Sequence, residues 1–204
     1  MQLKKINLPV EWWALRKLYR KAFPKCEQKP LWLVWLVKQK RKADVWIAEK
    51  DGEFAGFAIT MNGADLVLLD YLAVAEKLRG TGVGTQILKV LQMHYHDRRL
   101  FLEIENVYEE ADNRAERLRR KHFYLKNNMQ EMKIMVNAFG AELELLTYDC
   151  QVSYEEYYEL YCSCYGKWAA VNIVQLPYPG EHAGERSRIK RLKWVIFHSS
   201  ALNA

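Results

Sequence analysis

The chain has 204 residues, half of them hydrophobic, and carries a net charge of +6. This length suits one domain, or one domain with an extension, and the apolar content is ample for a core. The positive charge favours anionic partners, but a nucleotide cofactor, an acidic protein and a nucleic acid all qualify. The longest apolar run, residues 31–37, is too short to span a bilayer, so we expect a soluble protein.

The four cysteines, Cys26, Cys150, Cys162 and Cys164, have no zinc-binding spacing, because Cys162 and Cys164 are too close for the usual ligand pairs. The N-terminus shows no signal peptide, so we expect reduced thiols and a cytoplasmic protein. We expect no metal site.

Two helices are predicted near the N-terminus. In residues 9–23 the apolar side chains recur at helical spacing, and a second helix is expected to begin at Pro30, which suits a helix start. Trp32 and Trp35 in this second helix are expected to pack in the core, and the alternative is that they form a platform for a ligand.

Three antiparallel strands are predicted next. Residues 44–49 and 54–60 form a hairpin around Asp51-Gly52. Residues 66–74 add a third strand after a second turn signal. Such strands argue against a doubly wound parallel fold.

A glycine-rich turn, Arg79-Gly80-Thr81-Gly82-Val83-Gly84-Thr85, follows the third strand and leads into a helical pattern. A strand, a glycine turn and a helix together present backbone N–H groups and a positive helix end to a phosphate. The glycines allow close approach of the backbone, and Arg79 adds a planar cation. The turn therefore predicts a phosphate site.

The next segments complete a mixed sheet. Residues 100–105 form a strand whose alternation places Glu103 and Glu105 on one face. Residues 111–127 form a charged helix, and residues 129–136 and 141–148 form a closing hairpin.

Two motifs, about forty residues apart, together resemble the GNAT N-acetyltransferase superfamily. The first is Arg79-x-x-Gly82-x-Gly84 after its strand. The second is the segment 119–129, in which paired arginines precede Phe123-Tyr124. Asn128 stands where the family usually has glycine, and asparagine also tolerates the left-handed conformation at a helix end. The resemblance covers roughly residues 10–148 and implies the GNAT fold, an α/β (α+β) architecture with a mixed, mostly antiparallel sheet flanked by helices.

The resemblance implies a co-substrate, acetyl-CoA, and acetylation of a primary amine on a small molecule, a protein N-terminus or a lysine. Tyr124 matches the family's general acid for the departing thiolate, and a phenol pKa of about 10 keeps it protonated at neutral pH. Glu103, Asp70 and Glu105 are candidate general bases, and a water relay is the alternative. An interrupted strand near Leu72–Val74 would leave N–H groups for the oxyanion. The implied CoA-binding residues are Leu72, Ala73, Val74, Arg79, Gly80, Thr81, Gly82, Val83, Gly84, Thr85 and Tyr124.

We divide the chain into an acetyltransferase domain at residues 1–150, a helical extension at residues 151–177 and a basic tail at residues 178–204. Ser153 and Glu156 form a capping box that starts a helix. The tyrosines of this helix either pack in the core or form an aromatic wall for the acceptor. The tail has the composition of a loosely docked or disordered segment.

Two other functions remain open from the sequence. One is a CoA-binding regulatory or interaction module without turnover, and the other is a nucleic-acid binder that works through the basic tail. The partners we expect are acetyl-CoA and an amine acceptor, with no membrane. A homodimer is left open.

Overall fold

The computed structural model describes residues 1–179, apart from the side chain of Cys26. The strands are β1 (Gln2–Lys5), β2 (Ala43–Lys50), β3 (Glu53–Asn62), β4 (Leu66–Val74), β5 (Arg99–Glu105), β6 (Gln130–Ala138), β7 (Ala141–Tyr148) and β8 (Ile173–Leu176). The helices are α1 (Pro9–Ala22), α2 (Leu31–Gln39), α3 (Val83–His94), α4 (Arg114–Lys126), α5 (Tyr154–Tyr165) and α6 (Lys167–Ala170).

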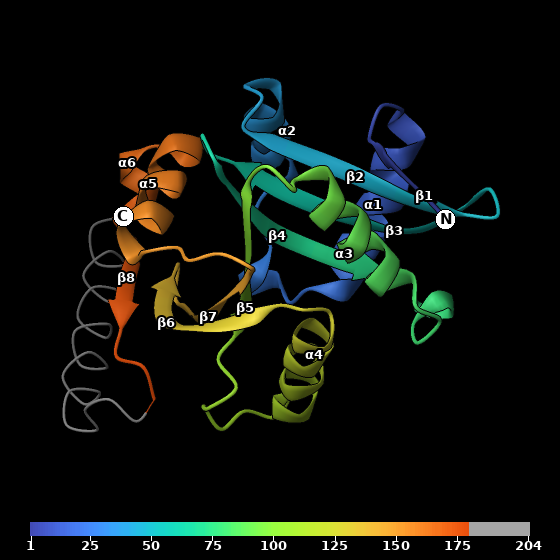
Figure 1. The fold of residues 1–204 in the computed structure, drawn as a ribbon. Helices are drawn as coiled ribbons and strands as arrows, with labels where there is room; N and C mark the ends of the chain where they lie inside the picture. The colour runs from blue at the N-terminus through green and yellow to red at the C-terminus, as the bar shows by residue number, and fades with distance from the viewer. Residues whose placement is uncertain (180–204) are drawn as a thin grey trace.

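The described strands form one sheet in the order β1-β2-β3-β4-β5-β7-β6-β8 (Figure 1). Every neighbouring pair is antiparallel except β4–β5, which is parallel. The predicted fold class, a mixed and mostly antiparallel sheet flanked by helices, is therefore confirmed.

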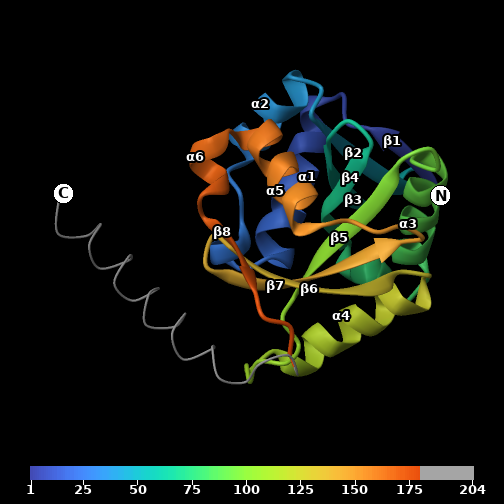
Figure 2. The same ribbon diagram turned by 60° about the vertical axis from the view of Figure 1, so that its left-hand side comes forward.

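Helices cover both faces of the sheet (Figure 2). On one face, α3 and α4 pack against β4 and β5 through residues that include Leu69 and Leu88. On the other face, α1, α2 and α5 pack against the same strands through residues that include Leu68 and Tyr71. Because both faces are buried, β4 is apolar along most of its length rather than alternating.

The sheet opens between its two central strands. The parallel pairing of β4 with β5 runs only from Leu66↔Arg99 to Leu69↔Leu102, although both strands continue to pair with their outer neighbours. A β-bulge lies in the register of β4 with β3, where Tyr71 pairs with Ile59 but Leu69 pairs with Thr60. The bulged residue is Asp70, and the extra residue redirects the strand at the point where the sheet splits.

The structure differs from the sequence prediction at helix α2 and at strand β1. Trp32 and Trp35 do not pack in the core, because they are 65% and 47% exposed. Val34 and Val37, three residues apart, face the sheet instead. Strand β1 was not predicted, since its sequence QLKK has no apolar alternation, yet it pairs with β2 at the edge of the sheet.

The chain after residue 150 joins the same sheet. Helix α5 begins with the predicted capping box of Ser153 and Glu156, and β8 pairs with β6. Most of the predicted basic tail, residues 180–204, lies outside the described residues. Within residues 1–179, no helix combines the length and the hydrophobicity that crossing a bilayer requires.

Candidate active site

A cavity of about 1400 Å³ opens where β4 and β5 separate. Its lining begins at the glycine turn and α4, passes the exposed edge of β4, and ends among the α1–α2 connection, α5, α6 and the β6–β7 turn. One continuous space therefore links the predicted phosphate site to the far side of the sheet.

The glycine turn has the geometry of an anion site. Gly80 and Gly82 have φ angles of +77° and +82°, which favour glycine. Gly82 precedes α3, whose first backbone bond runs from Gln86 N to Gly82 O. The N–H groups of residues 83–85 consequently have no backbone partner among the described residues. Together with the helix dipole they favour a bound phosphate.

The unpaired edge of β4 presents further N–H groups. Ala75 N donates to Ala55 O over 2.9 Å. Because every second N–H along a strand points to the same neighbour, the N–H of Ala73 also points towards β3. The N–H groups of Leu72 and Val74 then point to the opposite edge, where β5 no longer pairs with β4. This edge can bind an extended ligand by backbone hydrogen bonds.

Tyr124 lies on α4 and lines the cavity. Its side chain is buried, and burial raises the pKa of its phenol to about 12, although Arg120 lowers it. Arg120 itself pairs with Glu105. The hydroxyl of Tyr124 has no hydrogen-bond partner among residues 1–179, so its proton is available to a ligand.

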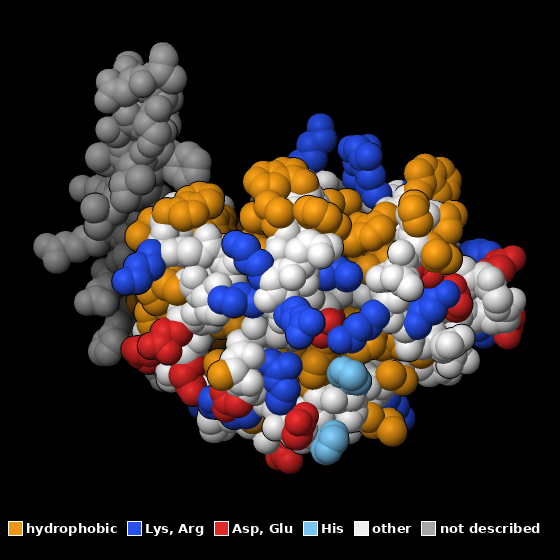
Figure 3. Space-filling model, turned by 90° about the horizontal axis from the view of Figure 1, so that it is seen from above, with side chains coloured by type: hydrophobic (Ala, Val, Ile, Leu, Met, Phe, Trp, Pro, Cys, Tyr) orange, Lys and Arg blue, Asp and Glu red, His pale blue; other side chains and the backbone are white. Residues whose placement is uncertain are grey.

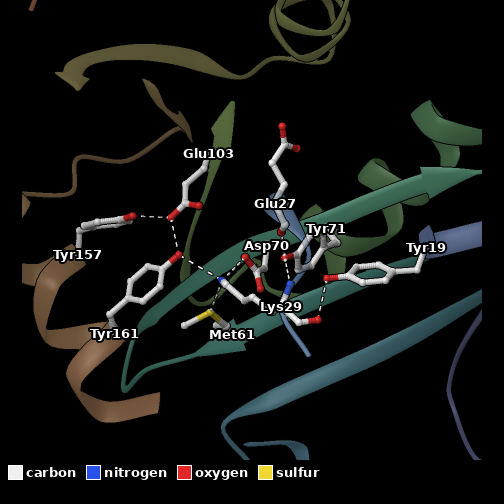
Figure 4. Close-up of polar contacts among 9 residues, drawn as sticks. All are labelled: Tyr19, Glu27, Lys29, Met61, Asp70, Tyr71, Glu103, Tyr157 and Tyr161. Carbon is white, nitrogen blue, oxygen red and sulfur yellow. Dashed lines mark hydrogen bonds and ion pairs between the residues drawn. The ribbon is translucent and has the colours of Figure 1, made fainter. Parts of the chain in front are cut away.

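Lys29 and Asp70 form a buried ion pair at the bulge (Figure 4). Lys29 Nζ lies 2.7 Å from Asp70 Oδ1 and 3.3 Å from the hydroxyl of Tyr161. The ammonium also lies over the rings of Tyr161, Tyr165 and Tyr71, at 4.9, 5.3 and 5.8 Å. Burial alone would lower the pKa of Lys29, but Asp70 raises it above its ordinary value, so Lys29 is a fixed cation.

The backbone around Lys29 is held by two tyrosines. Lys29 N donates to the hydroxyl of Tyr71 over 3.2 Å, and that hydroxyl donates to Glu27 O over 2.6 Å. Tyr19, on α1, donates to Lys29 O over 3.1 Å. The connection between α1 and α2 is thus fixed against β4 (Figure 4).

Glu103 faces the same cluster from β5. Its Oε1 accepts hydrogen bonds from Tyr157 and Tyr161 of α5, over 2.6 and 2.9 Å. Burial raises the pKa of Glu103, with a contribution from Asp70, while Lys29 and the two hydroxyls lower it. The net direction is upward, which makes Glu103 a stronger base than an ordinary carboxylate.

Most of the predicted site residues line this cavity. Glu103, Asp70 and Glu105 do so, as do Leu72, Ala73, Val74, Arg79, Gly80, Gly82, Gly84, Thr85 and Tyr124. Two side chains point elsewhere: Val83 is buried in the core, and the hydroxyl of Thr81 donates to Leu78 O over 2.8 Å. Among residues 1–179, no group of three or more His, Cys, Asp or Glu could hold a metal ion.

Sequence reasoning missed Lys29 and Tyr71. The sequence around Lys29 does not distinguish it from the other lysines and arginines nearby. Tyr71 fits the pattern of its strand as one more apolar residue. The tyrosines of α5 were expected either to pack in the core or to form an aromatic wall. Tyr157 and Tyr161 are buried in the core, and their hydroxyls bond to Glu103.

Comparison with known proteins agrees with this geometry. The family model of the acetyltransferase (GNAT) domain matches residues 41–128. A search of curated protein sequences finds no match to the chain. Among solved structures, a GNAT-family protein from Bacteroides thetaiotaomicron has a TM-score of 0.66 at 18% identity and covers 81% of this chain and 99% of its own.

Two further structures are enzymes with stated substrates. An aminoglycoside 6′-N-acetyltransferase complexed with coenzyme A has a TM-score of 0.56 at 19% identity and covers 75% of this chain and 100% of its own. The ribosomal-protein-S18-alanine N-acetyltransferase from Escherichia coli has a TM-score of 0.54 at 20% identity, with coverages of 76% and 96%. At such identities these likenesses show the fold.

The match of the family model and the shared fold agree with the two sequence motifs. Residues 41–128 match the acetyltransferase (GNAT) domain, and the chain shares the fold of solved GNAT-family acetyltransferases.

Proposed function

We propose that this protein transfers the acetyl group of acetyl-CoA directly to a primary amine of a small molecule, a protein N-terminus or a lysine. The observation that carries the proposal is the single cavity that joins an anion-binding turn, an unpaired strand edge and a cluster of proton-transfer groups. Together these features supply the three requirements of the reaction.

The first requirement is a bound and extended thioester. The N–H groups at the start of α3 would hold the pyrophosphate of CoA, with Arg79 lining the cavity beside them. The N–H groups of Leu72 and Val74 would pair with the pantetheine arm. One of them would then donate to the oxyanion of the tetrahedral intermediate.

The second requirement is a neutral amine. We assign the general base to Glu103, acting directly or through one water molecule, because burial raises its pKa and it lines the cavity. Asp70 Oδ1 is already occupied by the ammonium of Lys29. Asp70 therefore serves as a fixed charge rather than as the base.

The third requirement is a proton for the departing thiolate. Tyr124 can donate it, because its phenol stays protonated well above neutral pH and its hydroxyl has no competing partner among the described residues. Glu103 takes one proton from the ammonium group and leaves a neutral amine, whose attack forms the C–N bond. Collapse of the tetrahedral intermediate breaks the thioester C–S bond, Tyr124 gives its proton to the sulfur, and the second proton of the nitrogen returns to Tyr124.

The experiment is an amine panel with acetyl-CoA, read by thiol release. We expect turnover of at least one amine, and a fall of about 10²- to 10⁴-fold in kcat/KM for Glu103→Gln. Calorimetric binding of acetyl-CoA without thiol release from any amine would instead make the protein a CoA-binding module. Salt-dependent RNA binding by a protein that does not bind CoA would favour the nucleic-acid alternative.

A further inference from the structure

The half of the cavity beyond the bulge is where an acceptor would bind, and its side chains differ from those around the glycine turn. Exposed apolar side chains from three elements line it: Trp32 of α2, Phe139 of the β6–β7 turn and Trp168 of α6. Their exposed fractions are 65%, 45% and 72%. Large aromatic residues this exposed on a cavity wall indicate a binding surface for an apolar group.

The charged groups of the cavity offer little to a polycation. Asp70 pairs with Lys29, and Glu105 pairs with Arg120. Glu116 lies 3.8 and 3.9 Å from the arginines at positions 119 and 120. Only Glu103 and Glu27 lack a cationic partner within 4 Å among the described lining residues.

Glu27 does not belong to the acceptor cluster. In Figure 4 its carboxylate points away from Lys29. Burial raises the pKa of Glu27, and Arg120 and Arg117 lower it, so its electrostatic neighbours are on α4. When Glu103 is ionised, as a general base must be before it acts, the acceptor cluster of Lys29, Asp70 and Glu103 carries one net negative charge, which matches one ammonium group.

Figure 3 views the molecule from above, onto the side that carries α2 and α6. Hydrophobic side chains are exposed there, and cationic side chains lie between them. The exposed hydrophobic side chains offer contacts to an apolar body.

We infer that the acceptor is a small monoamine with an aromatic body, whose amine binds at Glu103 and Asp70 and whose ring contacts Trp32, Phe139 and Trp168. This inference rests on the proposed function, because it names the substrate class of the same site. Asp70 Oδ2 adds to it, since this buried oxygen has no hydrogen-bond partner among residues 1–179 and can accept an N–H of the bound amine.

The test compares amines that differ in the number of positive charges and in the presence of an aromatic ring. 2-Phenylethylamine and tryptamine carry one charge and a ring, propylamine carries one charge without a ring, and spermidine and kanamycin carry several charges. We expect kcat/KM for 2-phenylethylamine to exceed that for spermidine and kanamycin at least thirtyfold. A preference for either polycation overturns the inference while leaving acetyl transfer to an amine intact.

Variants of the tryptophans test where the aromatic part of the acceptor binds. Trp168→Ala and Trp32→Ala should each raise KM for 2-phenylethylamine about tenfold, with kcat little changed, while kcat/KM for propylamine stays within twofold. Trp13→Ala is the matched control, because Trp13 is 66% exposed on α1 but does not line the cavity. Equal losses for both amines, or an effect of Trp13→Ala as large as that of Trp168→Ala, would contradict the assignment.

A variant of Lys29 tests whether the ion pair with Asp70 limits the acceptor to a single ammonium group. Lys29→Met leaves Asp70 unpaired and should raise kcat/KM for 1,4-diaminobutane relative to 2-phenylethylamine at least tenfold, because a second ammonium can take the place of Lys29. An unchanged ratio would mean that the ion pair does not set charge preference.

A direct binding measurement distinguishes failure of the proposed function from failure of the inference about the acceptor. Calorimetric titration of each amine into the protein saturated with CoA ranks the acceptors without turnover. If CoA binds and no amine releases thiol, the proposed function falls. The ranking by calorimetry still shows which class of amine the cavity binds, and tighter binding of spermidine than of 2-phenylethylamine would overturn the inference.

Discussion

At the scale of single residues, Tyr124 gives the most direct test of the mechanism. Tyr124→Phe removes the hydroxyl and keeps the buried ring, so the fold should survive. We expect kcat to fall about 10²- to 10⁴-fold with little change in CoA affinity, because a general acid acts mainly in the transition state. Steady-state kinetics and calorimetry on the same preparations measure both quantities.

Tyr148→Phe is a suitable control for that substitution. Tyr148 packs against the same apolar cluster as Tyr124 but does not line the cavity. Its loss of a hydroxyl should leave kcat unchanged. If Tyr124→Phe retained kcat within threefold of the unmodified protein, Tyr124 would be a packing residue and solvent would be the proton source.

The hydroxyl of Tyr161 gives a test of the base. A hydrogen bond to the charged form lowers a carboxyl pKa, so Tyr161→Phe should raise the pKa of Glu103. A general base works only when deprotonated, and activity lost at low pH should therefore return at higher pH in the variant than in the parent. The measurement is the pH profile of kcat/KM.

Tyr158→Phe on the same helix controls for changes in α5 itself, because Tyr158 makes no hydrogen bond to Glu103 and does not line the cavity. An acidic limb that stays at the same pH in Tyr161→Phe would exclude Glu103 as the titrating base.

At the scale of elements, the turn before α3 combines two demands on one glycine. Gly82 has a φ of +82°, and a Cβ added there would meet no protein atom within 4 Å. Its side-chain position is therefore open to a ligand. Gly82→Val should weaken acetyl-CoA binding at least tenfold, through loss of the turn's conformation and obstruction of the phosphate.

Gly52→Val separates those two causes. Gly52 sits in the β2–β3 hairpin with a φ of +80° and equally open space, but outside the cavity lining. Both variants should lose stability, and only Gly82→Val should lose CoA affinity by calorimetry. Equal CoA affinity in the two variants would place the phosphates elsewhere.

The elements with strong local signals were predictable from the sequence. Asp51 and Gly52 have the positive φ angles of a two-residue hairpin turn, and Asn128 has a φ of +66° at the end of α4, as the left-handed reading required. The glycine turn and the segment around Phe123-Tyr124 together indicated the family. By contrast, α2 is apolar on all sides, so its periodicity could not show which side is buried, and the edge strands β1 and β8 depend on partners far away in sequence.

The residues of the candidate site likewise fall into those that the sequence predicted and those that it did not. Tyr124 and Glu103 were predicted because a motif or a strand alternation places them. The pairing of Lys29 with Asp70 was not, since 41 residues separate them and only the packing of the α1–α2 connection against the bulge brings them together. A close contact between distant segments leaves no local pattern in the sequence.

At the scale of the whole molecule, the segment after α6 is tied to the core by side chains as well as by β8. The hydroxyl of Tyr178 donates to Glu144 Oε1 over 3.0 Å and lies 2.9 Å from the hydroxyl of Tyr108. Glu144 is fully buried and pairs with Lys121 of α4 over 2.8 Å. Residues up to 178 thus cover a buried ion pair.

Two truncations test that arrangement. A chain shortened after Pro179 should keep its melting temperature and bind acetyl-CoA within about twofold of the full chain, because the contacts above are retained. A chain shortened after Asn172 loses β8 and Tyr178, and its melting temperature should fall by about 5–10 °C. Equal melting temperatures for the two shortened chains would show that the last strand adds no stability.

The early end of the β4–β5 pairing leaves the sheet short of hydrogen-bonding partners along one edge of β4. In solution the amide protons of Leu72 and Val74 should exchange rapidly with deuterium, while that of Ala73, bonded to β3, exchanges slowly. An extended pantetheine arm would act as a removable strand and protect the first two. Such binding also stabilises the fold in proportion to the logarithm of ligand concentration, so the protein's resistance to unfolding should follow the acetyl-CoA concentration around it.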